Sequence, residues 1–316
     1  MPIINTATMR DFLRRSITAN ANRNKLNGLR AELGFRAHLT ALGYADRVSQ
    51  GGWIFRRCQE EFGTRTIVVF PEVILPDIDY PVARPAPQIP LGLHTVCATF
   101  QQTGIHAYFC FGSVERENDA DSVRWSALRL GVPMNVPAVQ FPEHFDDFFV
   151  ERDRRHNFLA NNADLAWLPD ASVAGEFSKE CLRIAFRNRY LAEDSDVDGI
   201  FWGDQFTYPI EIKEKTVAND GQLGDWFGLD VGPFVKLAYY AAKRGNLNSL
   251  FVVHEIDDEQ TRNHVGWWFV RFEELARFAS WVPQGGGTNM RGGGSTVVKV
   301  PRHVFRPVNA EELARL

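Results

Sequence analysis

The chain has 316 residues, 45% of them hydrophobic and 23% charged, which is enough apolar material for one large or two ordinary domains. No apolar run reaches the roughly 18 residues that a membrane-spanning helix needs, and the first residues lack the apolar region of a secretory signal. We therefore expect a cytoplasmic protein without membrane contact. The formal net charge of −4 excludes a protein that coats nucleic acid nonspecifically, since such proteins are basic overall.

The first part of the chain, residues 1–168, is predicted to form a region of mixed α/β character. Leucines at near-helical spacing indicate a helix over residues 23–42, and Gly43 is placed to end it. Two strand-like runs follow, GGWIFRR and RTIVVFPEVI. We assign this region a role in substrate recognition, because the chemistry described below needs none of it.

The second part, residues 169–316, has a clearer order of elements. Its pattern predicts a helix, a two-stranded hairpin, a second helix and a further strand, over residues 173–190, 196–202, 208–216, 233–244 and 249–256. The predicted class is α/β.

The strand YPIEIKEK carries the residues that point to chemistry. Alternation along a strand places Ile210 and Ile212 on one face and Glu211 and Lys213 on the other. The hairpin brings Asp198 beside Glu211, and two carboxylates at that distance repel each other unless a cation lies between them. Oxygen ligands of this kind favour Mg²⁺ or Mn²⁺. A metal, a water and a lysine together meet the needs of phosphodiester hydrolysis.

These residues resemble a known family. Asp198 followed by Glu211, Ile212 and Lys213 is similar to the D–(x)n–E–x–K signature of the PD-(D/E)XK nuclease superfamily, which is restriction-endonuclease-like. The resemblance covers about residues 173–256. It implies a mixed β-sheet flanked by helices, with Asp198 and Glu211 as metal ligands and Lys213 as the catalytic lysine. A valine stands where the family pattern has a proline before the aspartate.

Three further residues are assigned around this centre. Many members of the family add an acid from the preceding helix, which here is Glu180 or Glu176, and we choose Glu180 as the third metal ligand. An ion pair between Glu180 and a nearby arginine is an equally weighted alternative. Lys215 and Lys236 are assigned to nucleic-acid binding, although a Lys236 that simply extends its stem towards solvent is the simpler interpretation.

Two structural alternatives stand beside the site. The EIKEK segment would also suit the charged face of an edge strand, where lysines deter aggregation. Glu32 lies on the early helix, ahead of two strand-like runs, an order that faintly resembles the nuclease core. Because no acid-x-lysine triplet follows there, we interpret Glu32 as a surface residue.

The expected function is Mg²⁺-dependent endonucleolytic cleavage of DNA, with Mn²⁺ as a substitute and restriction or phage defence as the setting. The alternatives are an RNA or structure-specific nuclease, and a catalytically silent nucleic-acid-binding protein. DNA is the expected partner, and a homodimer is considered alongside a monomer.

Overall fold

The computed structural model describes most of the chain and divides it into two units. The described residues are 2–18, 23–57, 66–77, 93, 97–98, 100–101, 104–129, 139–140, 145–158, 164–242, 248–283 and 296–316. One unit comprises Met1–Leu26 and Gln50–Val197, and the other comprises Asn27–Ser49 and Asp198–Leu316. In chain order, the Gln50–Val197 segment of the first unit therefore lies between the two segments of the second.

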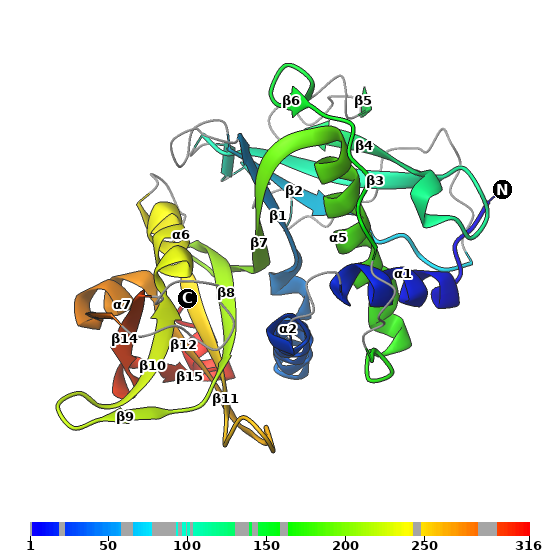
Figure 1. Ribbon diagram of the computed structural model, residues 1–316. Helices are drawn as coiled ribbons and strands as arrows, with labels where there is room; N and C mark the ends of the chain where they lie inside the picture. Colours follow the sequence, from blue (N-terminus) through cyan, green and yellow to red (C-terminus); the bar gives the residue numbers. More distant parts are fainter. Residues whose placement is uncertain are drawn as a thin grey trace. The chain divides into compact units, whose positions relative to one another are not determined.

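The first unit combines a sheet with two main helices. Its elements are α1 (Thr6–Thr18), β2 (Thr66–Pro71), β3 (His106–Val114), β4 (Val123–Arg129), β5 (Val139–Gln140), β6 (Val150–Glu151) and α5 (Asp170–Arg189). Strand β2 is parallel to β3, whereas β3 and β4 pair antiparallel, as do β4 and β5. Helices α1 and α5 pack against each other (Figure 1).

The second unit holds a mixed sheet and a smaller antiparallel one. Its elements are α2 (Arg23–Ala41), β8 (Thr207–Lys215), β9 (Ala218–Asp220), β10 (Gly224–Asp230), α6 (Val231–Ala241), β11 (Leu250–Ile256), β12 (His264–Arg271), α7 (Phe272–Phe278), β13 (Ser280–Pro283), β14 (Thr296–Pro301), β15 (Arg306–Pro307) and α8 (Ala310–Leu313). Strands β1 (Val48–Arg57) and β7 (Tyr190–Trp202) each pass from one unit into the other. The smaller sheet has the order β13-β14-β10-β9, with β9 and β10 forming the hairpin visible in Figure 1.

Strand β8 lies inside the main sheet of the second unit. It pairs antiparallel with β7 on one side and parallel with β11 on the other, and β11 continues to β12 and β15. Residues 207–210 pair with β7, whereas EIKEK pairs with β11 on one side and meets the Asp198 side chain through the Ile212 N–H on the other. The predicted helix, hairpin, helix and strand are all present, although the last predicted residues of the second helix, 243 and 244, lie outside the described residues.

Both faces of this sheet are covered by apolar packing. On one face, Ile210 and Ile212 of β8 pack in a core with Ala31, Phe35 and Leu39 of α2. The other face packs against α6 and α7 in a second core, which includes Phe251, Val253, Leu237 and Leu275. The alternation predicted for β8 is thus confirmed for its isoleucines, and its charged positions lie on the face that α6 covers.

Helix α2 ends as its sequence predicts. Gly43 has a φ of +84°, which a residue with a side chain adopts only at a cost. The Gly43 N–H donates to the Thr40 carbonyl, and the Tyr44 N–H donates to the Leu39 carbonyl. This pair of bonds is a Schellman motif, which satisfies the last carbonyls of the helix.

The predicted boundary near residue 169 differs from the division in the structure. Helix α5, which we placed with the catalytic region, belongs to the first unit, and α2, which we placed with the recognition region, lies almost wholly in the second. A division made by sequence position could not detect an insertion that leaves and re-enters the same unit. Within the described part of the chain, no helix is long and apolar enough to cross a membrane.

Candidate metal and nuclease site

Asp198 and Glu211 directly follow the paired part of β7 and β8. The pairing runs from Trp202–Thr207 to Gly199–Ile210, and Asp198 and Glu211 are the next residues on the two strands. Both side chains are buried, with 3% and 1% of their surface exposed. The Asp198 Oδ2 accepts a hydrogen bond of 2.6 Å from the Ile212 N–H. The predicted juxtaposition of the two strands is therefore present, and Asp198 is fixed to the backbone of the strand that carries Glu211.

Glu211 is held between two lysines. The Lys213 Nζ lies 2.6 Å from Glu211 Oε1, and the Nζ of Lys236, on α6, forms an ion pair with Oε2. The Lys213 side chain is 36% exposed and the Lys236 side chain only 12%, so solvent reaches the ammonium group of Lys213 more readily. Each oxygen of a deeply buried carboxylate thus has a positive partner, which offsets the cost of burying the charge.

Lys236 does not extend towards solvent. We predicted that it would either reach a phosphate or leave its charged end in water, but its ammonium group is turned inwards to Glu211. The inward direction of the Lys236 side chain follows from the position of α6. This helix covers the charged face of β8, so Lys236 lies close to the Glu211 carboxylate. The sequence places an apolar helix there without indicating which strand residue it faces.

Lys215 lies further along the same face of β8 and is half-buried. Burial lowers its pKa below the usual lysine value, against the opposing influence of the Asp230 carboxylate, and the charge of Lys213 adds to the lowering. Three lysines therefore gather on the α6 side of this strand, around one buried glutamate.

A second acidic group includes Asp198 and Glu32. Carboxylate oxygens of Glu32, on α2, and of Asp196 and Asp198, on β7, all lie within 4.8 Å of one another, and this group could hold a metal ion. Three clustered carboxylates supply oxygen donors of the kind that hard divalent cations prefer. Glu32, which we interpreted as a surface residue, is half-buried and belongs to this group. Among the described residues, Glu211 belongs to no such group of three.

The helical acid that we chose from the sequence lies elsewhere. Glu180, on α5 of the first unit, receives hydrogen bonds from Arg183 at 3.0 Å (Nε to Oε2) and 2.5 Å (Nη2 to Oε1). Both side chains are 7% exposed, and Arg183 also lies 3.4 Å from Asp194. The arginine-paired alternative is therefore the one present, in a buried form. Glu176 is also buried on this helix. Neither glutamate belongs to the described group of carboxylates that could hold a metal.

Glu32 was missed because its partners, Asp196 and Asp198, are distant from it in sequence. One signal was available on α2: Ala31, Phe35 and Leu39 recur at helical spacing and face the core, so Glu32 borders the buried side. The order of a helix followed by a strand was the other signal. Both were outweighed by the absence of a nearby acid-x-lysine triplet.

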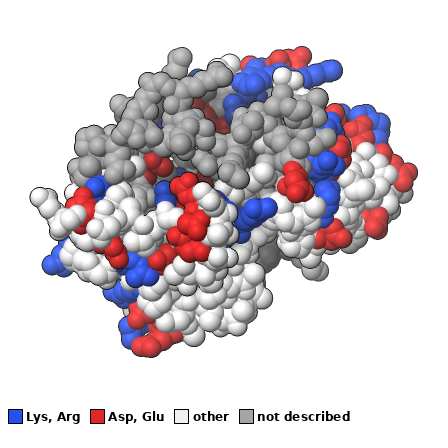
Figure 2. Space-filling view, turned by 60° about the horizontal axis from the view of Figure 1, so that its bottom comes forward, with Lys and Arg blue, Asp and Glu red and all other residues white. Residues whose placement is uncertain are grey.

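Charge on the surface is mixed. On the face drawn in Figure 2, basic and acidic side chains of the described residues are interspersed rather than separated into fields of one sign.

Comparisons with protein-family models, with curated proteins and with solved structures give no match to this chain.

Proposed function

We propose that the second unit is a Mg²⁺-dependent nuclease that hydrolyses phosphodiester bonds of DNA. The observation that carries this proposal is the hydrogen bond of Asp198 to the strand that holds the buried Glu211, with Lys213 on the same strand and Glu32 beside Asp198. Carboxylates and an ammonium group at one point of a sheet are unusual in a buried setting, because each carries a desolvation cost.

The order of elements supports the same proposal. In the second unit, α2 is followed by the Val48–Ser49 end of β1, then by β7, β8, α6 and β11, with β11 parallel to β8. A side chain on Gly199 of β7 would meet the Ser49 carbonyl oxygen at 3.4 Å, so this end of β1 lies against β7. A helix, three successive strands, a helix and a parallel strand resemble the PD-(D/E)XK core, with the first unit inserted between the first two strands.

The residues have distinct tasks in this proposal. Asp198 and Glu32 would hold the cation, which when bound would supply Lewis acidity at the phosphate, and Glu211 would join them on releasing a lysine. Water attacks phosphorus and gives up one proton, the bond from phosphorus to the leaving sugar oxygen breaks, and that oxygen takes up one proton, so the step balances. Lys213, the more exposed of the two lysines on Glu211, is placed to orient the water and to offset the negative charge that develops on the phosphate oxygens.

Binding a cation changes the partners of Glu211. Its two oxygens are engaged by Lys213 and Lys236, so a cation that shares this carboxylate competes with at least one ammonium group. The two ammonium groups offset the negative charge of Glu211 before the cation arrives.

The test is cleavage of plasmid DNA by purified protein in Mg²⁺, in Mn²⁺ and in EDTA, beside single-stranded RNA and branched DNA. Asp198→Asn removes a central carboxylate, and Asp204→Asn is its matched control, since Asp204 lies in the β7–β8 turn with an exposed side chain paired to Arg47. We expect metal-dependent cleavage of DNA by the wild type and the control, and none by Asp198→Asn. Cleavage of RNA or branched DNA, without cleavage of plasmid DNA, would favour the alternative of an RNA or structure-specific nuclease. Binding without cleavage of any substrate would favour the silent nucleic-acid-binding alternative.

A further inference from the structure

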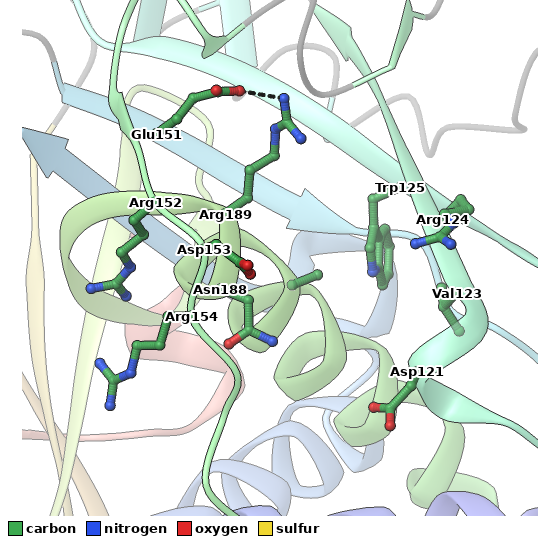
Figure 3. Close-up of a pocket in the computed structure, with 11 residues that line it drawn as sticks. Asp121, Val123, Arg124, Trp125, Glu151, Arg152, Asp153, Arg154, Asn188 and Arg189 are labelled. Carbon is green, nitrogen blue, oxygen red and sulfur yellow. Dashed lines mark hydrogen bonds and ion pairs between the residues drawn. The ribbon is translucent and has the colours of Figure 1, made fainter.

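A cavity in the first unit is lined by arginines. It has a volume of about 740 Å³ and lies between β4, the segment after β6, and the last turn of α5 (Figure 3). Its charged lining comprises Arg124, Arg152, Arg154 and Arg189 with Asp121, Glu151 and Asp153. A volume of this size admits a phosphate with its attached sugar.

A second, smaller cavity of about 100 Å³ shares part of this lining. Arg152, Arg154 and Asn188 line both cavities, and the smaller one adds Arg183, Arg187 and His156. No acidic residue lines the smaller cavity within the described part of the chain. The positive charge is therefore concentrated where the two cavities share Arg152 and Arg154.

The acids of the larger cavity are either neutralised or directed away from this point. Glu151 forms an ion pair of 2.5 Å with Arg189. In Figure 3, Arg152 and Arg154 project to one side of their segment and Asp153 to the other, as alternation in extended chain requires. Asp121 lies at the opposite end of the cavity, near Val123.

Several of these arginines have internal tasks. The guanidinium group of Arg152 donates to the Arg187 carbonyl oxygen, Arg187 pairs with Asp194 at 2.8 Å, and Arg124 pairs with Glu115 at 3.0 Å. These contacts hold the lining in position, so the cavity is formed before any ligand arrives.

Arg154 differs from its neighbours. Its side chain is exposed, and no carboxylate of a described residue lies within ion-pair distance of it. Its backbone N–H donates to the Asn188 carbonyl oxygen at 3.1 Å, which fixes the base of the side chain. The Asn188 side-chain amide is half-buried and makes no hydrogen bond to another described residue, so it offers a second donor.

We propose that Arg154, with Asn188 and Arg152, binds the phosphate backbone of duplex DNA at this arginine-lined cavity. Guanidinium groups and amides are donors to phosphate oxygens, and contacts of this kind position a duplex without selecting its sequence. The inference deepens the nuclease proposed above and rests on it for the identity of the ligand. It names the surface by which the first unit would hold the substrate.

The experiment measures binding of a short fluorescent DNA duplex in EDTA, where no cleavage occurs, over a series of salt concentrations. The test variants are Arg154→Ala and Arg154→Glu. The matched controls are Arg155→Ala and Arg155→Glu, because Arg155 is the next residue, is exposed and lines neither cavity. Circular dichroism and thermal unfolding check that all four variants are folded.

We expect Arg154→Ala to bind about tenfold more weakly, as for a lost hydrogen bond to a charged group, and Arg154→Glu to bind more weakly still. The slope of log affinity against log salt should fall by about one unit in Arg154→Ala. The Arg155 variants should change affinity less. Equal effects at both positions, or a wild type that binds no DNA, would overturn the inference.

Two further arms separate the outcomes. Inorganic pyrophosphate and a nucleoside monophosphate are titrated against the same variants, and Arg154-dependent binding of either in the absence of duplex binding would also overturn the inference, because the site would then serve a free phosphate compound. Cleavage in Mg²⁺ is measured in parallel. Normal DNA binding and cleavage by Arg154→Glu would contradict the DNA-binding role of this cavity and would leave the nuclease proposal standing. If the wild type binds DNA but never cleaves it, and the Arg154 variants bind DNA more weakly, the nuclease proposal would be contradicted and the DNA-binding role of this cavity would stand.

Discussion

Lys236 of α6 forms an ion pair with Glu211, the most deeply buried carboxylate of the candidate site, from the helix that covers its strand. Lys213 engages the other oxygen of the same group at 2.6 Å. The arrangement makes Glu211 part of the folding energy of the second unit as well as a candidate ligand, because removal of a buried ionic partner leaves the remaining charge uncompensated.

The first prediction concerns the stability of Glu211 variants. Glu211→Ala leaves two ammonium groups without their partner and should lower the free energy of unfolding by on the order of 2 kcal/mol, less than for a fully buried pair because Lys213 is partly exposed. Glu211→Gln keeps the shape and a hydrogen-bond acceptor and should lose less. Urea denaturation measures both, beside DNA cleavage, which each variant should lose. An unchanged unfolding midpoint in Glu211→Ala would contradict the buried ion pairs.

The second prediction separates Glu32 from Glu180. Glu32→Gln should weaken Mg²⁺-dependent cleavage, since Glu32 lies with Asp196 and Asp198 in the group that could hold a cation, and it should leave stability nearly unchanged. Glu180→Ala leaves Arg183 buried with Asp194, at 3.4 Å, as its one carboxylate partner among the described residues, so it should cost about 3 kcal/mol of stability. Cleavage at a temperature where both variants are folded, over a Mg²⁺ series, makes the comparison. A Mg²⁺ requirement that moves in Glu180→Ala and not in Glu32→Gln would reverse the assignment.

This contrast also marks how far the sequence could predict the site. The alternation on β8, the β7–β8 hairpin and the Schellman end of α2 at Gly43 depend on residues that are neighbours in sequence, and these predictions are confirmed. The Glu180–Arg183 pair is also local, three residues apart on one helix, and it was a weighted alternative. The placement of Glu32 beside Asp198 depends on the packing of distant segments, which periodicity does not report.

The small sheet of the second unit was missed for a related reason. Strands β10 and β14 pair across a long stretch of chain, and neither is bounded by a short turn to its partner. Their apolar residues, such as Phe227 and Val298, serve a core beside α6 and α7 that no local pattern indicates. The insertion of the first unit between β1 and β7 likewise has no local signal at either junction.

The third prediction uses the pKa of Lys215. Burial lowers this pKa below the ordinary value of 10.5, so at neutral pH the folded protein bears the cost of holding a charged, half-buried ammonium group. The folded state loses its proton before the unfolded state as pH rises, and stability therefore increases with pH between the folded pKa and 10.5. Lys215→Met should be more stable than the wild type at pH 7, and this advantage should shrink as pH approaches 10. Urea midpoints of both proteins at several pH values provide the measurement, and a difference that grows with pH would show that the sign is wrong.

The last prediction separates the two lysines that bracket Glu211. Loss of either ammonium group removes a positive charge beside the carboxylate, so both Lys213→Met and Lys236→Met should bind Mg²⁺ more tightly, by about tenfold for a change of about 1.4 kcal/mol. Only Lys213 is exposed enough to meet the water and the phosphate, since Lys236 of α6 is only 12% exposed. Lys213→Met should therefore lose about 10²-fold or more in single-turnover rate at saturating Mg²⁺, whereas Lys236→Met should retain most of that rate.

Lys213→Arg supplies the control for charge in this pair, because a guanidinium group stays protonated and cannot exchange a proton with the water. Lys213→Arg should therefore bind Mg²⁺ as weakly as the wild type does, whereas its single-turnover rate should stay as low as that of Lys213→Met. Lys215→Ala, on the same face of β8 but about 7 Å further along at ~3.3 Å per residue, should mainly weaken DNA binding, with an effect that decreases at high salt. Single-turnover cleavage and DNA affinity in Ca²⁺ are measured for all four variants. A rate loss in Lys236→Met equal to that in Lys213→Met would mean that the ammonium group acting on the phosphate comes from α6, and that Lys213 serves only to neutralise Glu211.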